Sequence, residues 1–260
     1  MARTNSKISR NKRLELIRQK LLDNGEVSTD KLAKQFKVSG MTIHRDIEQL
    51  VSTGEAVRTY GGAAMAKRLT FEFAFQDKQQ EKLKEKKRLA TEALKHIKDG
   101  QTIMLDTGTT TLQIARELIG KRKVTIITTS LAIVSQVQFA EDIKVILLGG
   151  FLRGGSPDMH GPLTEQNIEQ FKTDIVFMGA DAIDTNGNTY TDDLRVVNLD
   201  KKMASNASQV IVVADSSKFG ASAMCKVLKP KDYHLLITGT GVSTKIVKQL
   251  KNKKIKFKIV

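Results

Sequence analysis

The chain has 260 residues, of which 40% are hydrophobic and 27% are charged, a composition typical of a soluble globular protein with one large domain or two ordinary ones. No apolar stretch approaches the ~18 residues that a membrane-spanning helix needs, and no apolar run follows the N-terminus as in a secretory signal. The single cysteine, Cys225, excludes an intramolecular disulfide, and the four histidines show no paired metal-ligand spacing. We therefore expect a cytoplasmic protein with no membrane segment, no metal and no other cofactor.

The net charge of +15 is concentrated at the two ends of the chain. Residues 1–68 carry +7, residues 243–260 carry another +7, and the long middle part carries only +1. A basic N-terminal segment is typical of proteins that bind nucleic-acid phosphates. At the C-terminus, the alternation of Lys254 to Ile259 favours an edge strand with a lysine face, and a nucleic-acid role for this tail is the less favoured alternative.

Three short helices are predicted before residue 55. The first runs from about Asn11 and ends at Gly25, and the second begins near Ser28 as its N-cap. The third begins after Ser39, also as an N-cap, and ends at Gly54. The second and third helices, joined by a tight turn, predict a helix-turn-helix.

The segment that follows predicts a wing, and the outward face of the third helix predicts DNA contacts. Residues 56–60 form a predicted strand before a Gly-Gly turn. Arg45 suits a bidentate contact to guanine, and Thr42 suits a phosphate or a thymine methyl. The predicted DNA-binding residues are Ser39, Met41, Thr42, His44 and Arg45 from the helix, with Arg58, Tyr60 and Gly61 from the wing. The alternative is a three-helix protein-docking module with a solvated polar face.

Beyond residue 100, strand-like apolar runs alternate with amphipathic helices, which predicts a mostly parallel α/β domain. The predicted strands lie at residues 102–106, 124–127, 145–148, 175–178, 210–214 and 235–237. Before them, the charged run of residues 76–88 is compatible with a helix carrying Glu/Lys pairs, and the alternating phenylalanines of residues 70–75 are compatible with a short strand.

Polar residues follow five of these strands, and the carboxyl ends of parallel strands meet at one edge of a sheet. Hydroxyls and backbone N–H groups at a helix N-terminus suit a phosphate, and carboxylates suit sugar hydroxyls. The predicted ligand-binding residues are Asp106, Thr107, Gly108, Thr109, Thr110 and Thr111 after the first strand, Thr129 and Ser130 after the second, Gly149 and Gly150 after the third, Asp181 after the fourth and Lys218 after the fifth. Any one of these loops is equally well explained as a turn or cap, but five together favour a small anionic polyol ligand.

Both halves of the sequence resemble the DeoR family of bacterial transcription regulators. The resemblance rests on residues 38–47 (VSGMTIHRDI) and 58–63 (RTYGGA), and in the body on residues 105–110 (LDTGTT), 177–181 (FMGAD) and 214–220 (ADSSKFG). It implies a double-stranded DNA operator as partner, a sensor domain similar in fold to ribose-5-phosphate isomerase, a phosphorylated sugar as effector, and a repressor as the commonest role. The chain departs from the family at His44, where a second arginine is usual, and at Thr129, where asparagine is common.

The resemblance to an isomerase fold raises the alternative of an enzyme fused to a DNA-binding module. Isomerisation needs a carboxylate base beside the sugar and cationic help for the enediolate. Ribose-5-phosphate isomerases carry an Asp-Gly-Ala-Asp-Glu loop, whereas this chain has Met178 and Ala182 at the outer positions and no Lys-Gly-Gly-Gly run. We therefore predict a regulator with no catalytic residues.

The sequence divides into a DNA-binding domain at residues 1–62, a linker at 63–75 and a sensor domain at 76–260. One winged module contacts too little DNA for the affinity of a typical operator. A homo-oligomer on repeated or palindromic half-sites is therefore expected.

Overall fold

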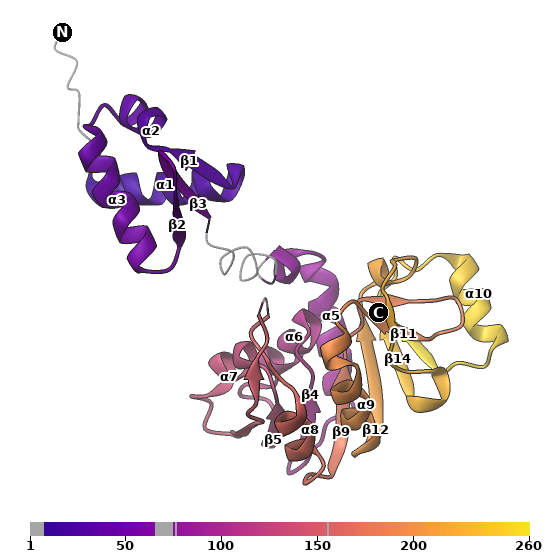
Figure 1. Cartoon of the computed structure of the whole chain (residues 1–260). Helices are drawn as coiled ribbons and strands as arrows, with labels where there is room; N and C mark the ends of the chain where they lie inside the picture. The colour runs from indigo at the N-terminus through magenta and orange to yellow at the C-terminus, as the bar shows by residue number, and fades with distance from the viewer. Residues whose placement is uncertain (1–7, 66–74, 76, 155) are drawn as a thin grey trace. The chain divides into compact units, whose positions relative to one another are not determined.

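The computed structural model describes residues 8–65, 75, 77–154 and 156–260. The chain forms two units that divide before Phe75, an N-terminal unit and a larger body (Figure 1). Among the described residues, no helix combines the length and the apolar character needed to cross a membrane.

The N-terminal unit is a winged helix-turn-helix, as predicted. Its elements are α1 (Arg10–Asn24), β1 (Glu26–Ser28), α2 (Thr29–Phe36), α3 (Gly40–Ser52), β2 (Ala56–Thr59) and β3 (Gly62–Met65), with the strands in the order β1-β3-β2. Gly25 ends α1 in the left-handed conformation, and its N–H donates to the Leu21 carbonyl. The Ser39 hydroxyl accepts from the Thr42 N–H and caps α3 as predicted, whereas the Ser28 side chain makes no such bond for α2.

The wing depends on two adjacent glycines. Gly61, in the turn between β2 and β3, has a φ of +80°, which is unfavourable for other residues. Its neighbour Gly62 pairs with Ser28, and a Cβ at this position would overlap the Val27 carbonyl. The close approach of β3 to β1 therefore requires a residue without a side chain.

Arg18 and Glu55 join α1 to the turn before the wing. The guanidinium donates from Nη2 to Oε1 of Glu55 at 3.0 Å and also from Nε to Oε2. This hydrogen bonding lowers the pKa of Glu55, so the pair stabilises the folded unit at neutral pH. The contribution is present above the ordinary pKa of a glutamate, near 4.5, and is lost as the pH falls through the lower folded value.

We expect Glu55→Gln to destabilise the protein at pH 7 and to make progressively less difference as the pH falls below ~4.5, because Glu55 then becomes protonated and, like glutamine, carries no charge. Thermal unfolding of both proteins between pH 3 and 7, followed by circular dichroism, measures this difference. A difference in melting temperature that stays constant across the range would contradict the assigned role of the ion pair.

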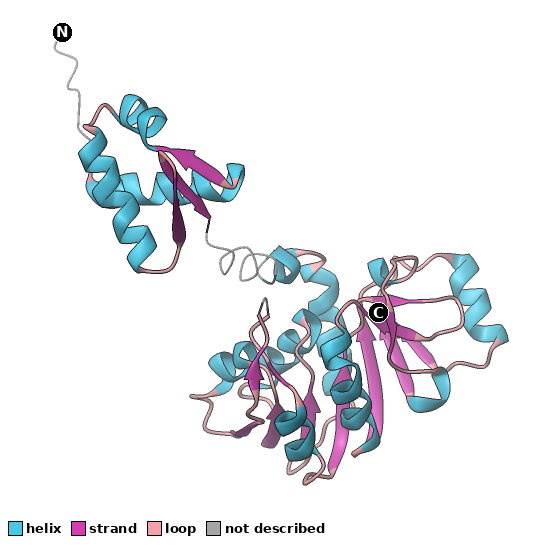
Figure 2. Cartoon of the chain, viewed as in Figure 1, coloured by secondary structure: helices cyan, strands magenta, loops and turns pink. Residues whose placement is uncertain are grey.

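The body is built on a twisted parallel sheet, whose strands are among the magenta arrows of Figure 2. In the described residues this sheet consists of β4 (Thr102–Leu105), β5 (Val124–Thr128), β6 (Ile143–Leu147), β9 (Thr173–Met178), β12 (Ala207–Ala214), β14 (Leu235–Thr238) and β15 (Phe257–Ile259). Their order in the sheet is β15-β14-β12-β9-β4-β5-β6, and each neighbouring pair is parallel. The chain therefore builds outward from β4 to β6, returns to the other side of β4 with β9, and builds outward again.

Helices cover both faces of this sheet, and a hydrophobic core lies on each side. The helices of the body are α5 (Leu83–Leu94), α6 (Thr109–Leu118), α7 (Leu131–Val137), α8 (Pro162–Ile168), α9 (Val197–Ser205) and α10 (Thr244–Asn252), with 3-10 turns η1 (Leu194–Val196), η2 (Ser216–Lys218) and η3 (Pro230–Asp232). Buried residues of α5, α6 and α7 join one core cluster, and buried residues of α8, α9 and α10 join the other. The predicted α/β architecture is confirmed.

Two small sheets were not predicted from the sequence. They are a hairpin of β7 (Phe151–Leu152) with β8 (Met159–His160), and a three-stranded sheet of β10 (Ala182–Ile183), β11 (Thr189–Thr191) and β13 (Cys225–Lys226). Strands of two or three residues are too short to show a period of two in the sequence.

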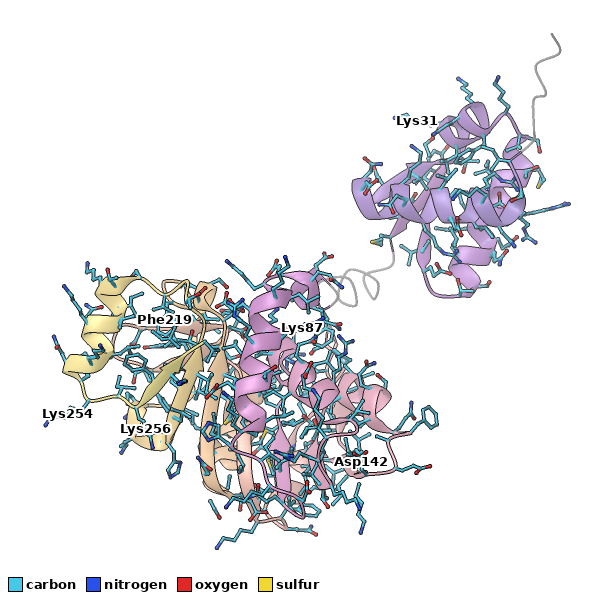
Figure 3. The ribbon with its side chains drawn as sticks, turned by 180° about the vertical axis from the view of Figure 1, so that it is seen from behind. Lys31, Lys87, Asp142, Phe219, Lys254 and Lys256 are labelled. Atoms are coloured by element: carbon cyan, nitrogen blue, oxygen red, sulfur yellow. The ribbon has the colours of Figure 1, made fainter. Side chains whose placement is uncertain are left out.

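The C-terminal alternation does form an edge strand. β15 lies at the end of the sheet beside β14, and Lys256 and Lys258 are exposed there. Figure 3 shows Lys254 and Lys256 directed away from the body. The strand itself spans only Phe257–Ile259, so Lys258 lies on it and Lys256 just before it, where both oppose pairing with another edge.

The predictions for residues 70–88, which precede the first strand of the parallel sheet, are only partly matched by the structure. The phenylalanine-rich strand proposed at residues 70–75 lies outside the described residues except for Phe75. The charged run is not one helix, because Lys82 adopts φ +53° and separates helical residues 77–80 from α5. Two of its charged side chains, Glu85 and Lys86, are also buried rather than solvated.

Candidate functional site

The first candidate surface is the outer face of α3. Met41, Arg45 and the capping Ser39 are exposed, and Thr42 and His44 are half-buried. The Thr42 hydroxyl lies 2.9 Å from the Ser39 hydroxyl, which fixes its position at the helix N-terminus. All five predicted side chains therefore occupy the first two turns of α3, where a recognition helix meets base edges.

An ion pair that the sequence did not reveal orients this helix. Asp46, on the inner face of α3, is 1% exposed and accepts from Arg13 of α1, from Nε at 2.5 Å and from Nη2 at 3.3 Å. Arg10 approaches the same carboxylate at 3.5 Å. The bonds hold Asp46 inward, so its neighbour Arg45 faces outward.

The wing supplies the other predicted DNA contacts. Tyr60 is fully exposed at the tip beside Gly61, and Arg58 is exposed on β2. Arg58 Nη2 lies 3.6 Å from the Glu48 carboxylate of α3. A pair between two exposed side chains is weak, so a DNA phosphate can compete with Glu48 for this guanidinium.

The second candidate site lies at the carboxyl ends of the neighbouring strands β4 and β9, where the order in which the chain adds strands to the sheet reverses. Leu105, at the end of β4, is in register with both Thr128 of β5 and Phe177 of β9, so the loops that follow these strands converge. In open α/β sheets, ligands bind in the crevice at such a point. Asp106 and the loop that follows β9 meet here.

Asp106 joins the two loops through its carboxylate. Oδ1 accepts from the Gly108 N–H at 2.9 Å and from the Thr111 hydroxyl at 2.6 Å, and Oδ2 accepts from the Gly179 N–H after β9. Burial raises the pKa of Asp106, and the three donors act against that shift. Both carboxylate oxygens thus accept hydrogen bonds from the protein, and Asp106 holds the two loops together.

The start of α6 remains suited to an anion. Gly108 is the N-cap and provides no side chain for capping, while the backbone N–H groups of the first turn have no partner within the helix. Thr107 and Thr109 are partly exposed, but Thr110 and Thr111 are buried. Of the predicted threonines, the first two are the better placed to contact a ligand through their side chains.

Asp181 and Lys218 complete this edge of the sheet. Oδ2 of Asp181 accepts from the Thr191 hydroxyl at 3.0 Å, and Oδ1 lies 4.0 Å from Lys78 Nζ. Lys218, in η2 after β12, is half-buried and makes no ion pair with any described residue. The edge therefore offers a cation and a carboxylate oxygen for further interactions.

The remaining predicted residues mainly make hydrogen bonds or close contacts within the protein. The Ser130 hydroxyl caps α7 by accepting from the Ile133 N–H, and the Gly149 carbonyl accepts from Thr164. A Cβ at Gly150 would overlap the Thr164 hydroxyl. Thr129 differs, because its hydroxyl is buried and finds no hydrogen-bond partner among the residues described.

Several charged residues near this edge were missed by the sequence analysis. Arg153 is 14% exposed and donates to the buried Asp158 and to Asp193. Asp200 of α9 has its pKa raised by burial and by the nearby charge of Asp106. No local sequence signal identifies such partners, because they come from separate loops.

The charged run of residues 76–88, which includes the start of α5, also reaches this edge. Glu85 accepts from the backbone N–H of Ser216, the first residue of η2, at 2.6 Å. Burial lowers the pKa of its neighbour Lys86, whereas the nearby Asp215 acts to raise it. Glu85 thus contacts the turn that carries Lys218, and Lys86 lies near the Asp215 that precedes this turn.

Comparisons with known proteins cover both units. A model described as the DeoR-like helix-turn-helix domain matches residues 13–68, and a model of the DeoR C-terminal sensor domain matches residues 81–240. The chain is 32% identical to a putative aga operon transcriptional repressor of Escherichia coli O157:H7, over 88% of this chain and 86% of that protein. It is also 32% identical to the glycerol-3-phosphate regulon repressor of Escherichia coli K12, over 81% of this chain and 82% of that protein.

Among solved structures, ribose-5-phosphate isomerase A of Methanocaldococcus jannaschii is similar, with 26% identity and a TM-score of 0.38 over 52% of this chain and 53% of that one. The two family models together span the winged unit and most of the body. The chain belongs to the DeoR family and is a DNA-binding transcription regulator.

Proposed function

We propose that this regulator represses a carbohydrate-metabolism operon, and that a phosphorylated sugar bound at the carboxyl ends of β4 and β9 changes its affinity for the operator. The observation that carries the proposal is the chemistry of that edge. Lys218 and the open first turn of α6 suit a phosphoryl group, and Asp181 Oδ1 suits a sugar hydroxyl. The name of the glycerol-3-phosphate regulon repressor supports an effector of the same chemical class.

We propose two kinds of role for the predicted ligand-binding residues. Thr107, Thr109, Asp181 and Lys218 are proposed to contact the effector, because their side chains are at least partly open. The others are proposed to shape the site: Asp106, Gly108, Thr110, Thr111, Thr129, Ser130, Gly149 and Gly150. The division into a DNA-binding domain, a linker and a sensor domain remains a proposal; the predicted boundary at residue 62 would divide β3, which pairs with β1 and β2 as far as Met65, so we propose that the linker begins after this strand.

The protein is further proposed to act in the cytoplasm as a homo-oligomer. A single winged module buries only ~600–1,000 Å² on DNA, less than a typical specific interface. On the body, Phe151, Leu152 and Leu163 are 67%, 58% and 55% exposed. Exposed apolar side chains of this size are compatible with a contact between subunits.

The isomerase alternative finds little support in the site. Met178, which stands where the isomerase loop has its first carboxylate, is 2% exposed and belongs to a hydrophobic cluster, and Ala182 is equally buried. Proton abstraction needs a positioned base. The two relatives described above match over most of their length and are named repressors, which supports the regulator over the enzyme.

A thermal-shift screen of the full chain tests the effector. The panel is ribose 5-phosphate, fructose 6-phosphate and glycerol 3-phosphate, each beside its unphosphorylated counterpart. A ligand at ~100 times its Kd adds about 2.7 kcal/mol to the stability of the unit that binds it. Stabilisation by a phosphorylated compound alone supports the proposal, and equal stabilisation by its unphosphorylated counterpart contradicts a phosphate-binding site.

For DNA binding, Arg45→Ala is expected to weaken operator affinity by about 1–3 kcal/mol and to relax the preference at one base pair, because the bidentate contact to guanine is lost. Binding-site selection followed by fluorescence anisotropy measures both effects. Arg45→Lys is the control: it keeps the charge but not the planar fork, so it should lose base preference while retaining more of the affinity. Unchanged affinity and preference in Arg45→Ala would remove Arg45 from base readout.

A further inference from the structure

The chain enters the body through a segment that contacts the proposed effector site. Residues 77–86 follow directly after the part of the chain that joins the two units. Within this segment Glu85 is 8% exposed. Its Oε1 accepts from the Ser216 N–H at 2.6 Å, and its Oε2 accepts from the Ser216 hydroxyl at 3.1 Å.

Ser216 opens the η2 turn, which also carries Lys218. The turn is internally rigid, because the Asp215 carboxylate accepts from the Ser217 N–H at 3.0 Å and from its hydroxyl, and the Lys218 N–H donates to the Asp215 carbonyl at 3.1 Å. Any displacement of Lys218 is therefore shared with Ser216, and through Ser216 with Glu85.

A second contact joins the same segment to the loop after β9. Lys86 is 3% exposed, and its ammonium donates to the Lys78 carbonyl, which ties the two ends of the segment together. Lys78 in turn lies 4.0 Å from Asp181. The segment thus contacts both Asp181 and the turn of Lys218, which are the two groups proposed to take the sugar and the phosphate.

Two glycines allow the close packing around Glu85 and Ser216. A Cβ at Gly239 would overlap the Glu85 carboxylate, and a Cβ at Gly241 would overlap the Ser216 hydroxyl. A buried carboxylate is costly unless its hydrogen bonds are made, so the bonds to Ser216 strongly constrain where α5 lies against η2. Glu92, on the same helix, is only partly exposed and pairs with its neighbour Lys95 at 2.7 Å, not with a residue of η2.

We propose that Glu85 is a positioning residue that transmits effector occupancy from the Ser216–Lys218 turn to residues 77–86, and so into the chain that leads to the DNA-binding unit. The inference rests on the proposed function. An effector that binds Lys218 and Asp181 changes the relative free energy of two arrangements of the Ser216–Lys218 turn. Because Glu85 is hydrogen-bonded to this turn, residues 77–86 move with it. Glu85 itself does not touch the effector.

The test compares Glu85→Gln with Glu92→Gln in the full chain. For each protein, the operator affinity is measured with and without the phosphorylated compounds of the panel, and the ratio of the two affinities is the response. Coupling between sites is typically 5–150-fold. We expect Glu85→Gln to keep its effector and operator affinities but to lose most of the response, while Glu92→Gln keeps all three. A wild-type response in Glu85→Gln would overturn the proposal.

Ser216→Ala provides a second, milder variant in case Glu85→Gln does not fold. It removes the hydroxyl donor and leaves the backbone N–H bonded to Glu85, so the response should fall by a smaller factor. If both variants are folded and respond as the wild type does, Glu85 has only a structural role.

Hydrogen exchange on the wild-type chain separates this inference from the function on which it rests. The compounds are ribose 5-phosphate, fructose 6-phosphate and glycerol 3-phosphate. Slower exchange at residues 106–111 and 215–218, together with a change at residues 77–86, supports both the effector site and the transmission. Slower exchange at the first two regions with no change at residues 77–86 overturns the transmission and leaves the effector site standing. No change at residues 106–111 with any compound rejects the effector site, and the transmission fails with it.

Discussion

Asp46→Ala is expected to destabilise the DNA-binding unit by about 3–5 kcal/mol, because it leaves Arg13 buried without its partner. Asp46 is 1% exposed and Arg13 is 6% exposed, so water cannot replace the lost bonds without opening the helix interface. The loss is comparable with the whole stability of a small domain. Hydrogen exchange of α3 in increasing urea measures the change for this unit alone.

The double variant Arg13→Met with Asp46→Leu is the control. Replacing both charges by apolar side chains of similar size is often neutral or stabilising, so much of the lost stability should return. A loss below ~1 kcal/mol in Asp46→Ala would mean that the pair behaves like an exposed salt bridge. In that case α3 would be positioned by its apolar face alone.

Asp106→Asn is expected to destabilise the body by about 2–3 kcal/mol, because a carboxylate that accepts three hydrogen bonds is replaced by an amide that offers one acceptor oxygen. The amide nitrogen must then face one of the donors, which are the Gly108 N–H, the Thr111 hydroxyl and the Gly179 N–H. These donors lie on the loop and helix after β4 and on the loop after β9. Without the carboxylate, the two segments should separate, and effector binding should weaken as well.

Urea unfolding followed by tyrosine fluorescence, to which the buried Tyr233 of the body contributes, measures the change. Thr111→Val is the matched variant, since it removes a single donor and should lose only about 0.5–1.5 kcal/mol. If Asp106→Asn loses no more than Thr111→Val, the carboxylate does not bridge the two loops.

The elements of both units follow from local patterns in the sequence. Gly25 ends a helix because only glycine readily takes the left-handed conformation that Gly25 shows. Ser39 begins another helix because its hydroxyl accepts a free N–H of the first turn. Apolar runs such as residues 210–214 are long enough to predict buried strands. Their carboxyl ends then have to meet at one edge, which is how a site near Asp106 and Asp181 could be predicted.

The long-range ion pairs and bonds could not be predicted in the same way. Asp46 and Glu85 occupy helices that also carry exposed charged residues, such as Arg45 and Lys87, and only the fold shows that they face inward. Glu85 meets a partner 131 positions further along the chain, and Asp46 meets one 33 positions earlier. Local periodicity contains no information about such partners. The residues that set the position of α3 and of η2 were therefore missed, while the outward residues beside them were found.

Operator binding by the full chain, measured by fluorescence anisotropy with and without each phosphorylated compound, tests the central claim most directly. The account predicts that a selected site binds at least ~10³-fold more tightly than scrambled DNA at the same salt concentration, and that one phosphorylated compound changes this affinity by about fivefold or more. The unphosphorylated counterpart should have no effect. Equal affinity for selected and scrambled DNA, or an affinity that no compound of the panel alters, would contradict a repressor controlled by a sugar phosphate.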